Sequence, residues 1–181
     1  MDLAIRQARR AEQDNEVPVG AVLLDSDGTL ISQGCNNVIT RHDPTAHAEI
    51  LAIRRGGQAK GNYRIPGSIL IVTLEPCIMC LGAIIQARIA TVVYGASDPK
   101  AGAIASQMHG AELPWSNHGF QVIDGIKAEQ CSSLLTNFFQ QRRHLHAMRR
   151  QHTSAQAFRN GLNTIQQGHH GTATHPVPTE R

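Results

Sequence analysis

The sequence contains no run of about 18 apolar residues, which is the length that suggests a membrane-spanning helix. Its first 16 residues mix acidic and basic side chains and lack the apolar stretch of a secretory signal peptide. It also lacks an internal repeat and a glycine-rich loop of the kind that cradles phosphates. We therefore expect a soluble cytoplasmic protein with no membrane partner and no nucleotide cofactor.

Acidic residues are almost absent from the C-terminal part of the chain, although the whole chain has a net charge of only +3. Residues 140–181 contain six Arg and a single acidic residue, Glu180, whereas acidic residues outnumber basic ones in residues 1–139. A basic segment of this kind favours a polyanionic partner such as a nucleic acid. The alternative is a solvated helix end, where arginines suit the helix dipole.

A chain of 181 residues fits one domain with a tail, because most domains are about 100 to 150 residues long. We predict a domain over residues 1–150 and a polar C-terminal tail over residues 151–181. The tail is rich in Gly, Thr, Pro and His, which leave little apolar surface to bury, so we expect disorder from about residue 160 onward.

Apolar residues within the domain alternate between strand and helix patterns. The predicted elements are an N-terminal helix that ends before Pro18, strands at 19–25 and 29–36 joined by a tight turn, a helix from about Ala46 that Gly56 and Gly57 end or interrupt, a strand at 68–74, a helix at 77–88, strands at 90–96 and 120–124, and a long helix from Lys127. Strands that alternate with helices predict an α/β sheet covered on both faces.

Two of the four cysteines, Cys77 and Cys80, lie three residues apart in a predicted helix that Pro76 begins. In a chain without a secretory signal this spacing is typical of metal or redox chemistry, and it places both thiols on one helix face. His47 lies at another predicted helix start. Two thiolates and one imidazole leave a zinc ion one open position, as in catalytic sites. A redox pair or a structural zinc site is the alternative.

Glu49 follows His47 by two residues, and this spacing limits where a shared metal can lie. Two helical residues separated by two positions point about 200° apart, so they reach one metal only at the helix end. The sequence therefore predicts a metal beyond the N-termini of two helices, whose dipoles favour thiolate ligands. There Glu49 either completes the ligand set or takes the proton of a bound water.

The order of these residues, His-x-Glu and then Pro-Cys-x-x-Cys, is the signature of zinc deaminases. Over roughly residues 1–145 the chain resembles the bacterial tRNA-specific adenosine deaminases in the stretches VPVGAVL, HDPTAHAEI, NYRI, TLEPCIMCLGA and VVYGASDPKAGA, and in FF followed by RR. The resemblance implies a three-layer α/β/α cytidine deaminase-like fold around a five-stranded mixed sheet. It also implies hydrolytic deamination of the wobble adenosine of a tRNA anticodon stem-loop to inosine, by a homodimer with one zinc ion per chain.

The resemblance also implies roles for individual residues. It assigns zinc binding to His47, Cys77 and Cys80. Zinc-bound hydroxide would attack C6 of the adenine, and Glu49 would shuttle the proton to the leaving ammonia.

Contacts to the RNA follow from the same resemblance. The residues that it implicates are Asn36 for the target base, Asp98 and Lys100 for the nucleotide backbone, and Phe139, Arg142 and Arg143 for the anticodon arm. By residue type alone, a strand-end cap explains Asn36 nearly as well, and a solvated turn explains Asp98 and Lys100 better than an RNA contact does.

Two other functions are compatible with the motifs. A deaminase of a free base or nucleoside, such as guanine or cytosine, shares the zinc motif but needs no basic C-terminal helix. A non-catalytic zinc-binding or RNA-binding module would bind the metal and release no ammonia from any substrate.

Overall fold

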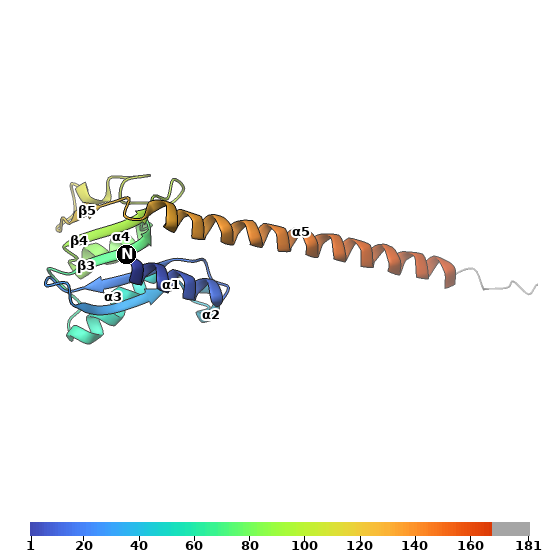
Figure 1. The fold of residues 1–181 in the computed structure, drawn as a ribbon, viewed down its shortest axis with the longest axis horizontal. Helices are drawn as coiled ribbons and strands as arrows, with labels where there is room; N and C mark the ends of the chain where they lie inside the picture. The colour runs from blue at the N-terminus through green and yellow to red at the C-terminus, as the bar shows by residue number, and fades with distance from the viewer. Residues whose placement is uncertain (168–181) are drawn as a thin grey trace, which may run out of the picture. The chain divides into compact units, whose positions relative to one another are not determined.

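The computed structural model describes the backbone of residues 1–167 and the side chains of residues 1–150. Its elements are α1 (Asp2–Gln13), β1 (Gly20–Leu24), β2 (Leu30–Cys35), α2 (Val38–Arg41), α3 (Ala48–Lys60), β3 (Ile69–Leu74), α4 (Ile78–Ala87), β4 (Thr91–Ala96), η1 (Gly110–Glu112), β5 (Gln121–Ile123) and α5 (Ala128–Gln167) (Figure 1). They form two compact units, of which the first is Met1–Phe139 and the second begins at Gln140.

Five strands form one mixed sheet in the order β2-β1-β3-β4-β5 (Figure 1). β1 pairs antiparallel with both β2 and β3, whereas β3, β4 and β5 run parallel. The predicted mixed five-stranded sheet is therefore confirmed. Because of these directions, β2, β3 and β4 end at the edge of the sheet where β1 begins. The loops at this edge hold the candidate site.

Two glycines show that helices cover opposite faces of the sheet. A Cβ on Gly20 would lie 2.1 Å from the Ala4 carbonyl oxygen of α1, and one on Gly34 would lie 2.3 Å from the Ala48 carbonyl oxygen of α3. Gly20 pairs with Cys35, the neighbour of Gly34, so the two glycines face opposite sides. The three-layer prediction is thus confirmed.

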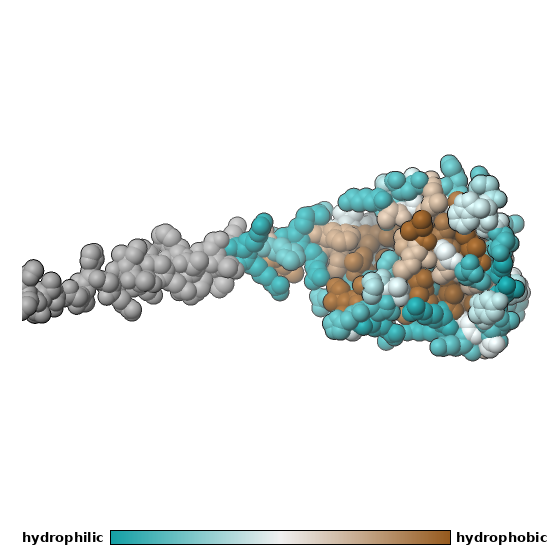
Figure 2. All heavy atoms as spheres, turned by 180° about the vertical axis from the view of Figure 1, so that it is seen from behind, coloured by the Kyte–Doolittle hydropathy of each residue, from teal (hydrophilic) through white to brown (hydrophobic). Residues whose placement is uncertain are grey.

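Figure 2 shows the face opposite to that of Figure 1. On this face of the first unit, hydrophobic residues gather inside a hydrophilic rim.

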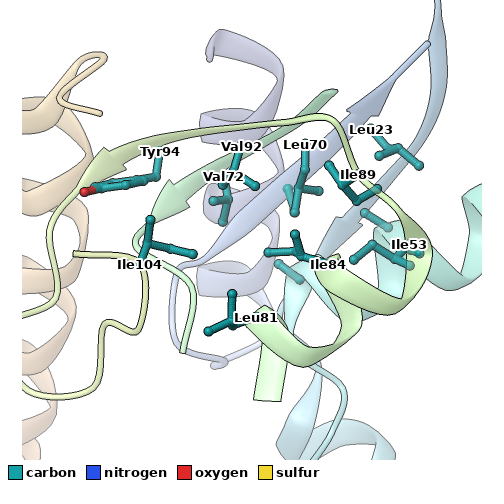
Figure 3. Packing of buried hydrophobic residues seen from close by; sticks show 14 of the residues in the cluster. Leu23, Ile53, Leu70, Val72, Leu81, Ile84, Ile89, Val92, Tyr94 and Ile104 are labelled. Carbon is teal, nitrogen blue, oxygen red and sulfur yellow. The ribbon is translucent and has the colours of Figure 1, made fainter. Parts of the chain in front are cut away.

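The main core lies between the sheet and the helices α3 and α4 (Figure 3). Leu70 and Val72 of β3 and Val92 of β4 pack there with Leu81 and Ile84 of α4, and all five are buried. Burial of each such side chain contributes about 1.5 to 3 kcal/mol. This packing fixes α4, and with it the two cysteines at the N-terminal end of that helix.

Helix α3 differs from its prediction, because the two glycines at positions 56 and 57 neither end nor interrupt it. Gly56 is buried, and a Cβ there would lie only 2.3 Å from Leu23 Cδ2 of β1. Its missing side chain thus allows close packing of helix on sheet. The helix ends instead at Gly61, whose φ of 62° is the left-handed conformation common after a helix C-terminus.

Helix α5 begins as predicted, with Cys131 and Phe138 buried and Phe139 exposed. Cys131 joins Ile5 of α1 and Ala96 of β4 in a second apolar cluster. The helix continues past the predicted domain boundary at residue 150 to residue 167, and the rest of the predicted tail lies outside the described residues. Within the described part of the chain, every helix is too short or too polar to cross a membrane.

Candidate metal centre

Three potential metal ligands from two helix starts meet at the sheet edge described above. His47 is the N-cap residue of α3, Cys77 is the N-cap residue of α4, and Cys80 lies in the first turn of α4. His47 Nδ1 lies 3.7 Å from Cys77 Sγ and 3.6 Å from Cys80 Sγ. All three ligand atoms lie within 4.8 Å of one another. The structure thus brings the predicted ligands together, although Cys77 precedes its helix instead of lying inside the first turn.

The local backbone explains why both N-cap side chains reach the same point. His47 has φ −68° and ψ 154°, and Cys77 has φ −76° and ψ 174°, so both residues are extended immediately before a helix. An extended residue in this position directs its side chain beyond the first turn, where N–H groups lack helical partners. Two positive helix ends therefore face the cluster and favour anionic thiolates there.

The cluster itself favours a bound cation. A hydrogen bond with Cys80 lowers the pKa of the Cys77 thiol to about 3, and the same contact raises the pKa of Cys80. A hydrogen bond with Cys77 raises the pKa of His47. The Cys77 thiolate attracts a cation, and a metal ion that binds would displace the proton of Cys80. Two sulfurs and one imidazole nitrogen are the ligand chemistry of zinc, with one tetrahedral position left for water or substrate.

Glu49 lies beside the three ligands but outside their cluster. It is the second residue of α3 and is only 4% exposed. Burial raises the pKa of its carboxyl group. A carboxylate with a raised pKa is suited to accept and return a proton near neutral pH. The group of candidate ligand atoms consists of His47, Cys77 and Cys80, and the proton-transfer role of Glu49 stays a prediction.

A pocket of about 350 Å³ opens onto His47, Cys77 and Glu49. This volume lies within the usual range for small-molecule sites. Apolar side chains near the start of β1 and in α2 form part of the wall, and Asn36 and Asp98 contribute polar groups. The pocket thus combines a metal-binding cluster, a buried carboxylate and a surface that can receive a flat apolar group.

Of the residues predicted to contact RNA near the site, Asn36 and Asp98 line the pocket, whereas Lys100 lies outside it. Asn36 lines the pocket, and its Nδ2 donates to Glu16 Oε2 at 3.5 Å. Asp98 also lines the pocket, but its Oδ1 accepts the N–H groups of Lys100 and Ala101 and so shapes the turn. Lys100 is exposed and is not part of the pocket wall.

The remaining predicted contacts lie on α5. Phe139 is 44% exposed and stacks edge-to-face with Phe138, at 5.5 Å between ring centroids. Arg142 and Arg143 belong to the second compact unit, where Arg142 is partly buried and Arg143 is exposed.

Two acidic residues of the pocket wall were not predicted from the sequence. Glu16 is fully buried and accepts the N–H of Thr40 at 2.7 Å, and Glu75 is 2% exposed. Each is an acidic residue directly before an apolar residue or a proline, in the stretches NEVPVG and LEPC. An acidic residue within an apolar stretch indicates a carboxylate that is buried and held by hydrogen bonds. This pattern was the signal in the sequence that could have identified Glu16 and Glu75.

The three-layer α/β/α fold, the Cys₂His cluster and the neighbouring buried carboxylate define a zinc-dependent hydrolase. The family model of the cytidine and deoxycytidylate deaminase zinc-binding region matches residues 1–96. The chain belongs to this family of zinc deaminases, and zinc is its cofactor.

Within this family, the chain is similar to several individual proteins of known sequence or structure. A tRNA-specific adenosine deaminase from Haemophilus influenzae is 50% identical over 143 residues, which are 79% of this chain and 83% of that protein. A chain solved in studies of A-to-I editing by tRNA:A34 deaminases at the wobble position of transfer RNA is 44% identical, with a TM-score of 0.72, over 75% of this chain and 97% of that one. A guanine deaminase from Nitrosomonas europaea has a TM-score of 0.66 at 22% identity, over 75% of this chain and 80% of that one, and so shares the fold.

Proposed function

We propose that this protein deaminates adenosine to inosine at the wobble position of a tRNA anticodon. The similarity to tRNA-specific adenosine deaminases carries this proposal, because one of them is 50% identical over 143 residues, which are 79% of this chain. A tRNA substrate implies action in the cytoplasm. The anticodon stem-loop is a suitable form of the substrate, since a loop nucleotide can be splayed out of the stack at little cost.

The site residues divide the work of the reaction. His47, Cys77 and Cys80 would hold the zinc ion, which when bound activates a water molecule as nucleophile. Glu49 would accept a proton of that water and pass it to the exocyclic amine, so that ammonia can leave. Its carboxylate is buried and lines the pocket that would receive the base. Asn36 would hydrogen-bond the edge of the base from the pocket wall.

Contacts outside the pocket would position the rest of the RNA. We propose that Asp98 and Lys100 meet the backbone of the inserted nucleotide from the turn after β4. Phe139, Arg142 and Arg143 would contact the anticodon arm, since arginines bind phosphates and an exposed aromatic ring can stack on a base. Within this proposal residues 1–150 form the catalytic domain, and residues 151–181 form a tail that the chemistry does not need.

We also propose that the protein acts as a homodimer. Hydrophobic residues gather on one face of the first unit (Figure 2), and Ile78, the residue after the ligand Cys77, is 67% exposed. An exposed apolar face of this kind is typical of a protein interface. Sedimentation velocity should give a dimer for the wild type and a monomer for Ile78→Asp. The loop residue Trp115, which is 74% exposed, supplies the control, since Trp115→Asp should remain a dimer. A monomeric wild type would contradict this proposal.

The decisive experiment incubates the zinc-loaded protein with an anticodon stem-loop that carries adenosine at the wobble position and then measures inosine. A stem-loop with the adenosine moved one position away is the substrate control, and Glu49→Gln is the protein control. Inosine should form only with wild-type protein and correctly placed adenosine. Deamination of free guanine or cytosine without inosine in the stem-loop would favour a free-base deaminase. Zinc binding without ammonia from any of these substrates would favour a non-catalytic module.

A further inference from the structure

Glu75 is a buried carboxylate at the pocket that takes no part in the proposed proton transfer. It follows β3 directly and lies two residues before the ligand Cys77. Its side chain is 2% exposed and lines the same pocket. Burial of a carboxylate destabilises the folded protein unless hydrogen bonds within the protein replace those that it made to water.

The loop that follows β4 supplies those hydrogen bonds. Glu75 Oε1 accepts the N–H groups of Ile104, Ala105 and Ser106 at 3.1, 2.8 and 2.9 Å. Glu75 Oε2 accepts the N–H of Asp98 at 3.0 Å and the hydroxyl of Ser106. Burial by itself raises the pKa of Glu75, but the bonds from Ser106, Ala105 and Asp98 outweigh it and lower the pKa. The Glu75 side chain is thus hydrogen-bonded to both ends of the segment 98–106.

The same loop is attached to the segment that carries the metal ligand. The N–H of Ala103 donates to the Pro76 carbonyl oxygen at 2.8 Å, and Gly102 forms an isolated β-bridge with Cys77. The loop passes so close to Glu75 that a Cβ on Gly102 would lie 2.3 Å from its carboxyl carbon. Residues 98–106 contain no regular helix or strand that could hold this shape without the carboxylate.

We propose that Glu75 is a positioning residue that holds residues 98–106 as one wall of the nucleotide pocket. Asp98 and Ala101 of this loop line the pocket, so the carboxylate sets the surface that meets the substrate. The inference rests on the proposed deaminase function. Because the loop forms the wall, whereas Glu49 and the zinc ligands perform the chemistry, loss of the carboxylate should weaken substrate binding more than turnover.

Glu75→Gln is the direct test because it keeps the size of the side chain and removes its ability to accept at both ends. An amide has one acceptor oxygen, and its NH₂ group would face the N–H of Asp98 or the N–H groups at the other end of the loop. We expect amide hydrogen exchange in residues 104–106 to accelerate at least about tenfold. KM for the stem-loop should rise roughly tenfold, kcat should stay within about threefold, and zinc should stay near one per chain. Glu112→Gln, an exposed carboxylate in η1, is the matched control and should change none of these quantities.

Two further variants keep the test decisive if Glu75→Gln does not fold. Ser106→Ala removes only the hydroxyl bond to Oε2, so KM should rise less than in Glu75→Gln. Gly102→Ala keeps the carboxylate but pushes a methyl group against it, so KM should rise with kcat retained.

Unchanged exchange and unchanged KM in Glu75→Gln would overturn the inference. So would a fall in kcat or loss of zinc at constant KM, because Glu75 would then act on the metal centre instead of on the loop. If the wild type forms no inosine, the proposed function fails by itself. Hydrogen exchange and zinc content require no activity and would still decide whether Glu75 holds the loop.

Discussion

Replacement of Glu49 by glutamine should abolish most turnover while the metal centre persists. The substitution exchanges one carboxylate oxygen for an NH₂ group in a side chain that is 4% exposed, so the packing at the start of α3 is kept. The three ligand atoms belong to His47, Cys77 and Cys80, and none of them is changed. An amide neither accepts nor returns a proton near neutral pH, so the general acid/base is removed selectively.

The expected loss in kcat is about 10²-fold to 10⁴-fold, which is typical for removal of a general acid/base. At 1.36 kcal/mol per factor of ten this corresponds to about 2.7 to 5.4 kcal/mol of transition-state stabilisation. Single-turnover inosine formation on the anticodon stem-loop gives the rate, and elemental analysis gives the zinc content. Binding of the stem-loop should be nearly unchanged, with Glu112→Gln as an exposed carboxylate control.

The same variant should stabilise the metal-free protein at neutral pH. Burial raises the pKa of Glu49 above its ordinary value of 4.5, so the folded state holds this proton more tightly than the unfolded state. The free energy of unfolding therefore falls as the pH rises from below 4.5 through the raised pKa of the folded state. Glu49→Gln has no such loss, and its metal-free thermal midpoint should exceed that of the wild type at pH 7 but not at low pH.

Two outcomes would refute this reasoning about Glu49. If the variant purified without zinc while the wild type held about one ion per chain, Glu49 would be a fourth ligand. If kcat fell less than about tenfold, another group would carry the proton.

Further predictions concern the ligands, the arginines and the sheet packing. Cys77→Ala should reduce zinc from about one ion per chain to a small fraction under the same purification, and full retention would contradict the ligand assignment. The double variant Arg142→Ala, Arg143→Ala should bind the stem-loop with a weaker salt dependence. The slope of log affinity against log salt concentration should fall by roughly 0.7 to 0.9 for each phosphate that the variant no longer binds, while kcat at saturation stays nearly unchanged. An unchanged slope in a salt series would show that these arginines lie outside the RNA interface. Gly34→Ala should lower the free energy of unfolding by about 1 to 3 kcal/mol in urea, because its Cβ would lie 2.3 Å from the Ala48 carbonyl oxygen; wild-type stability would show that α3 can move away from the sheet.

The class of fold and the metal ligands could be predicted from local patterns. Each of these patterns involves only a few neighbouring residues, as in the apolar runs of β3 and β4 and the helical spacing around Cys80. Two short motifs, around His47 and Cys77, carry the ligand chemistry for the same reason. Strand alternation with helices then implied the layers, because sheets covered on both faces require that order.

Helix α3 shows where local patterns mislead. Two consecutive glycines lower helix propensity and predicted an end or an interruption. In the structure the helix continues, because at Gly56 the absence of a side chain lets the helix approach Leu23 on the neighbouring strand. The energy that decides the matter comes from a contact between distant parts of the chain.

The sequence by itself determined the ligand types, the buried strands and the basic C-terminal segment, since these depend on composition and on spacing within one element. Only the tertiary structure decided that Glu16 and Glu75 line the pocket, because their hydrogen-bond partners lie 20 to 31 residues away along the chain. It also decided that His47 and Cys77 both precede their helices and meet at one sheet edge. Register and strand direction bring such residues together, and no periodicity in the sequence records which distant residues will face each other.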